Sequence, residues 1–198
     1  MKKTLLLLTM LLCVTPLRAA DNSETYYVPA PQLNAALQIM DMGFSHIFAL
    51  FRNATGSFSF DDTNKSISNL RIALDMTSLI ANSNENQRDL ATMFGVFQFP
   101  ELRISAPDSV TFTNNKAQIK ATLSLHGVSK PITFDAVLNK AGKTARAGGL
   151  WSSEGEAVGI SLRGVIKRSD FGLAENAEAQ PRFGDNLNLS LELLAIKQ

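Results

Sequence analysis

The chain has 198 residues, of which 45% are hydrophobic and 19% charged, with one cysteine and a formal net charge of +1. Three of the 19 basic residues, Lys2, Lys3 and Arg18, lie in the first twenty positions, so 16 basic residues remain against 18 acidic ones, a net charge of about −2. Such a near-neutral chain lacks the basic footprint of a protein that binds nucleic acid or an anionic membrane surface.

The first twenty residues, MKKTLLLLTMLLCVTPLRAA, have the pattern of a secretory signal. Two lysines precede an apolar run from Leu5 to Val14, and Ala19 with Ala20 forms a small-residue exit. The run is shorter than the roughly 18 apolar residues of a membrane span. We therefore predict a signal peptide at 1–20, a periplasmic or secreted protein and no membrane insertion. Because Cys13 lies in this segment, the mature chain has no thiol for catalysis, disulfides or metal binding.

Beyond residue 21 the dominant pattern is a period-2 alternation, which is typical of antiparallel strands with one wet face. It occurs at 69–77, 117–126, 132–140, 157–167 and 186–194. Turn signals separate such runs at 53–56, 61–65, 114–115, 127–130, 141–142 and 185–186. Eight to ten strands without a linker favour one domain at 21–198, either a closed barrel or a sandwich.

One segment, near residues 84–94, predicts a short helix instead. Asn82 followed by Glu85 resembles a capping box, and Gly95 is a plausible stop. The apolar residues Leu90, Met93, Phe94 and Phe97 fall on one helical face.

The two histidines are interpreted as structural. His126 precedes the Gly127–Lys130 turn signal, and Pro131 suits the first residue of the next strand. A metal site needs several converging ligands, whereas His46 and His126 stand eighty residues apart with no HxH or HExxH spacing. We expect no cofactor and no metal.

Several segments, in their order, resemble the YceI-like family of exported polyisoprenoid-binding proteins. They are MGFSHIFALFRNATGSFSFD, LSLHGVSKPITF, GVIKRSDFGL and GDNLNLSLELLA, and the resemblance covers nearly all of residues 26–196. It implies an all-β, lipocalin-like antiparallel barrel of about eight strands, with a long apolar cavity that holds an isoprenoid chain. It also implies that HGVSKP is a structural hairpin signature.

The chain departs from the family pattern at three places. Members often have Asp where this chain has Pro29, and a histidine before the Leu/Met-Gly pair where it has Asp41. In the helix, members usually have Arg-Asp-x-His-Leu, whereas here Leu90 follows Arg88-Asp89 directly. These positions lie near the expected cavity entrance, so the ligand could differ from that of the family.

The inward-facing side chains are the expected ligand site. Small inward residues such as Ala117, Ala121, Ala136 and Gly164 would leave room for a chain. A charged head group would favour Arg52, Arg88, Lys130, Arg163 or Arg168 near an opening, although each of these side chains is more often a solvated surface charge. The residues predicted to bind the ligand are Ile72, Leu74, Met93, Phe94, Ala121, Leu123, Phe134, Ala136, Ile160 and Leu162.

Other interpretations stay open. Phenylalanines could fill the barrel, leaving an exported stress or interaction protein, and a homodimer is compatible with the sequence. An enzyme acting on lipids would need a nucleophile and base, for which Asp41 with His46 and Asp135 with His126 are the only conceivable pairs. The residue pattern therefore favours a carrier that is not an enzyme.

Overall fold

The computed structural model describes residues 22–144, 155–173 and 182–197, which form a closed antiparallel barrel. The predicted signal peptide at 1–20 lies outside these residues. Tyr26 and Tyr27 of the first strand pair with Lys197 and Ile196 of the last, which closes the ring. The ring order is β1 (Glu24–Val28), β4 (Ala54–Asp61), β5 (Ser66–Asp75), β7 (Glu101–Ala106), β9 (Lys116–Leu125), β10 (Val128–Thr144), β11 (Gly155–Lys167) and β12 (Phe183–Lys197). The predicted eight-stranded barrel is thus confirmed.

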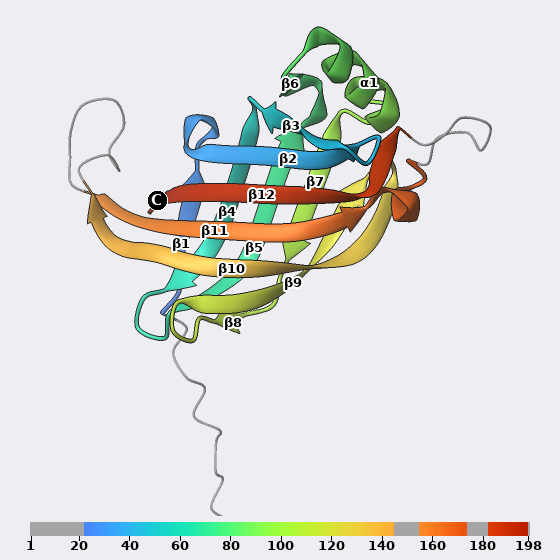
Figure 1. Cartoon of the computed structure of the whole chain (residues 1–198). Coiled ribbons are helices and arrows are strands. Elements are labelled where there is room, and N and C mark those ends of the chain that lie inside the picture. Colours follow the sequence, from blue (N-terminus) through green and yellow to red (C-terminus); the bar gives the residue numbers. More distant parts are fainter. Residues whose placement is uncertain (1–21, 145–154, 174–181, 198) are drawn as a thin grey trace, which may run out of the picture.

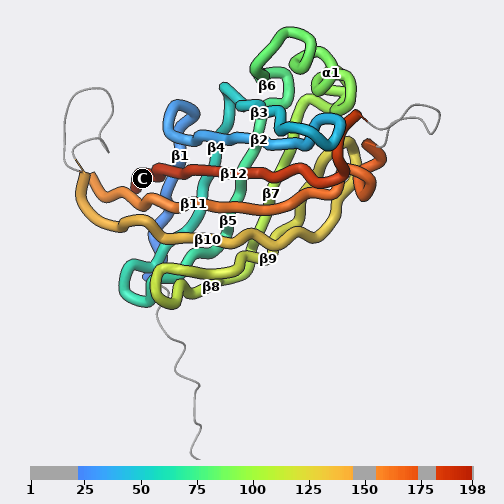
Figure 2. Tube along the Cα trace, in the orientation of Figure 1, coloured from blue at the N-terminus to red at the C-terminus, as the bar shows by residue number. Residues whose placement is uncertain are grey.

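Three further strands extend the sheet beyond β12. β12 pairs with β2 (Leu33–Asp41), β2 with β3 (Ser45–Phe51), and β3 with β6 (Leu79–Ala81). In Figure 1, β10, β11, β12 and β2 form the front wall, while β1, β4, β5 and β7 cross steeply behind it. The backbone tube in Figure 2 follows the same crossing. The remaining elements are β8 (Val110–Thr111), which pairs with β5, and the short helices η1 (Ala30–Gln32), η2 (Met76–Ser78) and η3 (Arg168–Phe171).

The core follows the alternation of the strands. On β9, Ile119, Leu123 and Leu125 are buried, while Lys120 and Thr122 between them are exposed. The other ring strands bury every second residue in the same way. Their inward side chains join into one apolar cluster that runs through the barrel.

The structure corrects the predicted hairpin loop at 127–130. Leu125 pairs directly with Val128, so the turn consists of His126 and Gly127 alone, with φ angles of 52° and 74°. Two positive φ angles define a type I′ turn, whose twist matches that of the flanking strands. Pro131 lies inside β10, ahead of the part that pairs with β11, and therefore does not begin the strand.

Of the other predicted turns, one has different bounds and two are wrong. The connection between β3 and β4 is confirmed but consists of residues 52–53, since β4 begins at Ala54, whereas β10 continues through 141–142 to Thr144. Residues 185–186 fall within a bulge of β12, where the register shifts between Phe183 and Leu187. Turns are confirmed at 61–65 and at Asn114-Asn115, whose residues both have positive φ.

The predicted helix is confirmed as α1 (Asn84–Phe94). Its N-cap is Ser83, whose hydroxyl accepts the N–H of Asn86, and not the expected Asn82. Gly95 ends the helix in the left-handed conformation, as predicted. Leu90 and Phe94 face the core, but Phe97 lies beyond the helix and is 95% exposed, so its expected place on the buried face is wrong. No helix within the described ranges is both long and apolar enough to cross a bilayer.

Candidate functional site

The sequence motifs meet at one end of the barrel, beside α1. The His126 ring packs against Phe99 with centroids 4.2 Å apart, and its Nδ1 lies 3.2 Å from the carbonyl oxygen of Phe171. Since a carbonyl only accepts, Nδ1 carries the proton and donates it. A Cβ on Gly127 would lie 3.1 Å from Phe99, so the turn fits closely under this ring. His126 is therefore a hydrogen-bonded structural residue, in agreement with its interpretation from the sequence.

Arg168 anchors the same end from inside the protein. Its Nε, Nη1 and Nη2 donate to the carbonyl oxygens of Gly184, Leu173 and Phe183 at 3.2, 2.7 and 2.9 Å, and the residue is only 5% exposed. A guanidinium bonded in this way holds η3 against the start of β12. The expectation that Arg168 could meet a ligand head group is therefore wrong.

Asp185 adds a polar contact on the outside of this junction. It accepts the backbone N–H of Ser169 at 2.9 Å and the Ser169 hydroxyl at 3.0 Å. The backbone hydrogen bond, helped by the hydroxyl and by nearby cations, holds the pKa of Asp185 below its usual range.

A second arginine, Arg182, joins Asp41 and Asp89, which lie at two of the three places where the chain departs from the family pattern. Its Nε donates to Asp41 at 2.9 Å, and its two terminal nitrogens donate to Asp89 and to the side-chain oxygen of Asn86. The hydrogen bond to Asp41 is the largest cause that raises the pKa of Arg182. Because Asp41 ends β2 and Asp89 lies in α1, this cluster, here called the Arg182 latch, ties the helix to the β2–β3 hairpin.

The opposite flank of α1 is an open cleft of about 590 Å³. Met76, Leu79 and Val96 line it and are at most 3% exposed, so its floor belongs to the barrel core. Arg88 lies on its helical wall and the exposed Phe97 on its rim. Sequence reasoning missed both features. The Arg182 latch joins segments that are distant in the chain, whereas the cleft is formed within residues 76–98, by the way in which η2, β6 and α1 pack together.

The structure brings the ten predicted ligand residues into one apolar cluster. Nine are at most 7% exposed, and Met93 is partly buried against them. Ile72 and Leu74 lie on β5, Ala121 and Leu123 on β9, Phe134 and Ala136 on β10, Ile160 and Leu162 on β11, and Met93 and Phe94 on α1. They therefore line one continuous interior, from the walls up to the helix.

The expected room beside Gly164 is occupied by a protein side chain. A Cβ on Gly164 would lie 2.7 Å from Cε1 of Phe134 and 3.3 Å from Cδ1 of Ile132. A Cβ at this distance would force the Phe134 ring to shift, so the absence of a side chain at Gly164 accommodates that ring. Here the small inward residue leaves no space for a ligand, and this part of the expectation is wrong.

The other four cations considered for a ligand head group do not form a cluster. Arg52, Arg88, Lys130 and Arg163 are exposed, and of these the cleft includes Arg88 alone. Within the described ranges, no group of three or more His, Cys, Asp or Glu side chains is placed to hold a metal.

Neither conceivable catalytic pair is joined by a hydrogen bond among the described residues. Asp41 bonds to Arg182, while His46 is exposed on β3. Asp135 accepts from Gln118 at 3.2 Å, and His126 donates to a backbone carbonyl. Asp41, Asp135 and His126 are therefore each hydrogen-bonded to another group, and His46 faces solvent, so neither pair is arranged as a catalytic pair.

Comparison with known proteins identifies relatives over most of the chain. A UPF0312 protein of Pseudomonas putida F1 is 27% identical over 81% of this chain and 79% of its own length. Protein YceI of Salmonella arizonae is 28% identical over 69% of this chain and 68% of its own.

Solved structures share the fold. BcnA of Burkholderia cenocepacia has a TM-score of 0.69 at 14% identity, covering 84% of this chain and 98% of its own. A polyisoprenoid-binding domain from Saccharophagus degradans has a TM-score of 0.58 at 11% identity, covering 89% and 99%. The family model for the YceI-like domain matches residues 26–195. The chain therefore belongs to the YceI-like family.

Proposed function

We propose that this protein is an exported, non-catalytic carrier that binds a long isoprenoid lipid. The observation that carries the proposal is the cleft beside α1, whose floor of Met76, Leu79 and Val96 is continuous with the apolar core. Its volume of about 590 Å³ lies in the usual range for small-molecule sites. The likeness to a polyisoprenoid-binding domain supports the same ligand class.

The energetics favour a long chain. Each buried CH₂ contributes about 0.8 kcal/mol, so a five-carbon isoprene unit contributes roughly 3 to 4 kcal/mol. Association costs roughly 4 to 15 kcal/mol, which one or two units barely offset. A chain of several units binds tightly without a polar anchor. In this proposal it enters at the cleft and extends past Phe94 and Met93 toward Ala121 and Ala136.

An alternative is an exported protein with a solid barrel that acts through its surface. The fit of Phe134 against Gly164 favours it, since at that level the interior is filled. The two functions differ in what happens when an inward alanine is enlarged. Ala121 is 7% exposed and lies mid-strand between Ile119 and Leu123.

The test combines lipid extraction with three substitutions to phenylalanine. Native protein from its source organism is extracted with organic solvent and the extract is measured by mass spectrometry. Ala121→Phe changes the interior, Ala91→Phe changes the cleft wall, and Val165→Phe is the control, because Val165 faces outward on β11 and is 53% exposed.

The carrier predicts a polyprenyl lipid in the extract of wild type and Val165→Phe, and its loss from the other two variants. It also predicts that delipidated Ala121→Phe keeps its stability within about 1 kcal/mol. A solid barrel predicts no lipid in any extract and a destabilisation of about 1 to 3 kcal/mol from overpacking. Absence of lipid from the native protein, together with no uptake of an added polyprenol of several units, would refute the carrier.

A further inference from the structure

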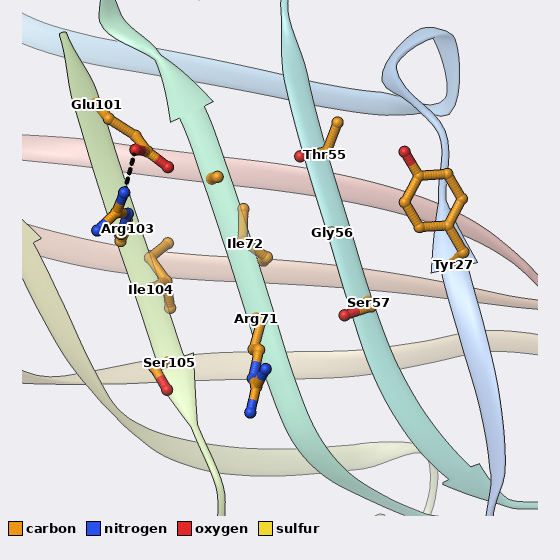
Figure 3. A pocket seen from close by; sticks show the side chains of 11 residues that line it. Tyr27, Thr55, Gly56, Ser57, Arg71, Ile72, Glu101, Arg103, Ile104 and Ser105 are labelled. Atoms are coloured by element: carbon orange, nitrogen blue, oxygen red, sulfur yellow. Dashed lines mark hydrogen bonds and ion pairs between the residues drawn. The ribbon is translucent and has the colours of Figure 1, made fainter.

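A hollow of about 330 Å³ lies on the outer wall of the barrel, on β1, β4, β5 and β7 (Figure 3). It forms because small outward residues alternate with large ones. Register pairs place Tyr27 beside Ser57, Ser57 beside Arg71, and Arg71 beside Ser105, in one row across the four strands. The hollow is separate from the cleft beside α1, with which it shares no lining residue.

The polar groups of this row are not engaged with one another. Across the described residues, no hydrogen bond or ion pair joins the side chains of Tyr27, Ser57, Arg71 or Ser105 to any protein group. The opposite wall is different: there Gln118 bonds to Asp135, Asn139 to Ser161, and Ser161 to Glu192. The row formed by Tyr27, Ser57, Arg71 and Ser105 therefore keeps its polar side chains available, unlike these pairs on the opposite wall.

The charges in the hollow leave one cation available. Arg103 donates to Glu101 at 2.6 Å, which neutralises both, as the dashed line in Figure 3 marks. Arg71 has no acidic partner in the described part of the chain, is exposed, and lies on the strand between those of Ser57 and Ser105 (Figure 3). A planar guanidinium flanked by two hydroxyls suits a bidentate carboxylate or phosphate.

Tyr27 adds an aromatic surface at the edge of the hollow. The residue is 38% exposed, and Figure 3 shows its ring nearly face-on from outside the barrel. Exposed aromatic rings of this kind provide a rigid apolar face with a polar tip. Sugar rings combine an apolar face of C–H groups with a rim of hydroxyls, so they match a tyrosine ring beside serine and threonine hydroxyls.

From these observations we infer that the outer wall binds an anionic saccharide. One sugar ring stacks on Tyr27 and bonds through its hydroxyls to Ser57, while the acidic group of a neighbouring sugar pairs with Arg71 and its hydroxyls bond to Ser105. Two sugars are needed because Tyr27 and Ser105 lie three strands apart, at roughly 4.8 Å for each spacing. A second hollow of about 360 Å³ shares Thr55, Ala73 and Glu101 with the first, which gives room for more than one sugar ring. The inference does not depend on the proposed lipid carrier, because the site lies on the other side of the wall.

The experiment titrates the full protein with tri-galacturonate, with the neutral trisaccharide of galactose, with galactose 6-phosphate and with inorganic phosphate, by isothermal calorimetry. Tri-galacturonate is expected to bind at least about tenfold more tightly than the neutral sugar, since hydrogen bonds to charged groups are the strong ones. Comparison of the two acidic sugars distinguishes a carboxylate from a phosphate as the anion. Binding by either one, above the neutral sugar and above phosphate alone, supports the inference.

Matched variants locate the site. Arg71→Gln and Tyr27→Ala should each weaken binding of the acidic sugar at least about tenfold, whereas Tyr27→Phe should keep it within about threefold. Lys120→Gln is the control, because Lys120 is an exposed cation on β9 outside the hollow. Equal affinity for acidic and neutral sugars, phosphate binding as tightly as a sugar acid, or an unchanged affinity in Arg71→Gln would each overturn the inference.

Discussion

Replacing Arg182 with glutamine should loosen α1 before it unfolds the barrel. The side chain of Arg182 is 29% exposed, and those of Asp41 and Asp89 are 22% and 41% exposed, so solvent screens both ion pairs in part. At roughly 0.5 to 1 kcal/mol for each pair, the Arg182 latch contributes about 1 to 2 kcal/mol. The substitution also leaves two carboxylates near each other without their shared cation, so the loss should fall toward the upper value.

Amide hydrogen exchange measures this effect locally. Exchange of the α1 amides should accelerate about five- to thirtyfold in Arg182→Gln, because each 1.4 kcal/mol corresponds to a factor of ten. Exchange of the β11 and β12 amides should change far less. A double-mutant cycle with Asp89→Asn should give a coupling of at least about 0.5 kcal/mol. Unchanged exchange in α1, or a coupling indistinguishable from zero, would show that Arg182 does not hold the helix.

Three further predictions concern stability. His126→Ala should lower the free energy of unfolding by about 1 to 2 kcal/mol in denaturant melts, because it removes the hydrogen bond to the carbonyl oxygen of Phe171 and the ring contact with Phe99. His46→Ala, at an exposed position, should lower it by less than about 0.5 kcal/mol. Both variants should retain lipid within about threefold of wild type. Gly164→Ala should cost about 1 to 3 kcal/mol by overpacking, and Phe134→Leu in the same chain should recover part of that loss. The pKa of Asp185 is lower in the folded protein, so its stabilising contribution should be complete above about pH 4 and lost as the pH falls further, and Asp185→Asn should flatten that part of a stability-versus-pH curve.

The faces of the strands could be predicted because period 2 leaves no choice. Once Ile119 faces the core, Leu123 must face it too, and a shift of one residue would place the polar side chains inside. The same argument assigned eight of the ten expected ligand residues to the buried interior, on four strands, and the helical period of α1 assigned Phe94. Whether that interior also holds a ligand is a separate matter, which the extraction experiment addresses.

The loop errors have a common physical cause. Residues such as Gly142, with a φ of 139°, and the pair at 185–186 carry the chemistry of a turn, but here the chain uses them inside long strands. A barrel needs such residues to bend its strands as well as to end them, and β-bulges perform that function. Local composition alone does not distinguish a bulge from a turn, since both need backbone freedom. The distinction depends on strands paired from elsewhere in the chain.

The Arg182 latch could not be predicted for a different reason. Asp41, Asp89 and Arg182 lie more than 40 residues apart from one another in the sequence, and each looks like an ordinary surface charge. Only the departures from the family pattern marked these acids: Asp41 is itself one, and Asp89 lies beside the missing x-His residues before Leu90. Two unexplained acids at a predicted barrel entrance were a signal that a shared cation should be sought.

The two unlike flanks of α1 indicate how a lipid chain would enter. Lifting the whole helix would expose Leu90 and Phe94, which are at most 1% exposed, at a cost of roughly 1.5 to 3 kcal/mol each, in addition to the 1 to 2 kcal/mol of the Arg182 latch. The sum is about 4 to 8 kcal/mol, so the lifted state would hold at most about one molecule in a thousand. Entry through the cleft would not expose a buried side chain at the rim, because Phe97 is already 95% exposed. Entry along the loop after α1, with the Arg182 latch closed, is therefore the lower-energy route, and it leaves the latch to keep the helix seated while the chain exchanges.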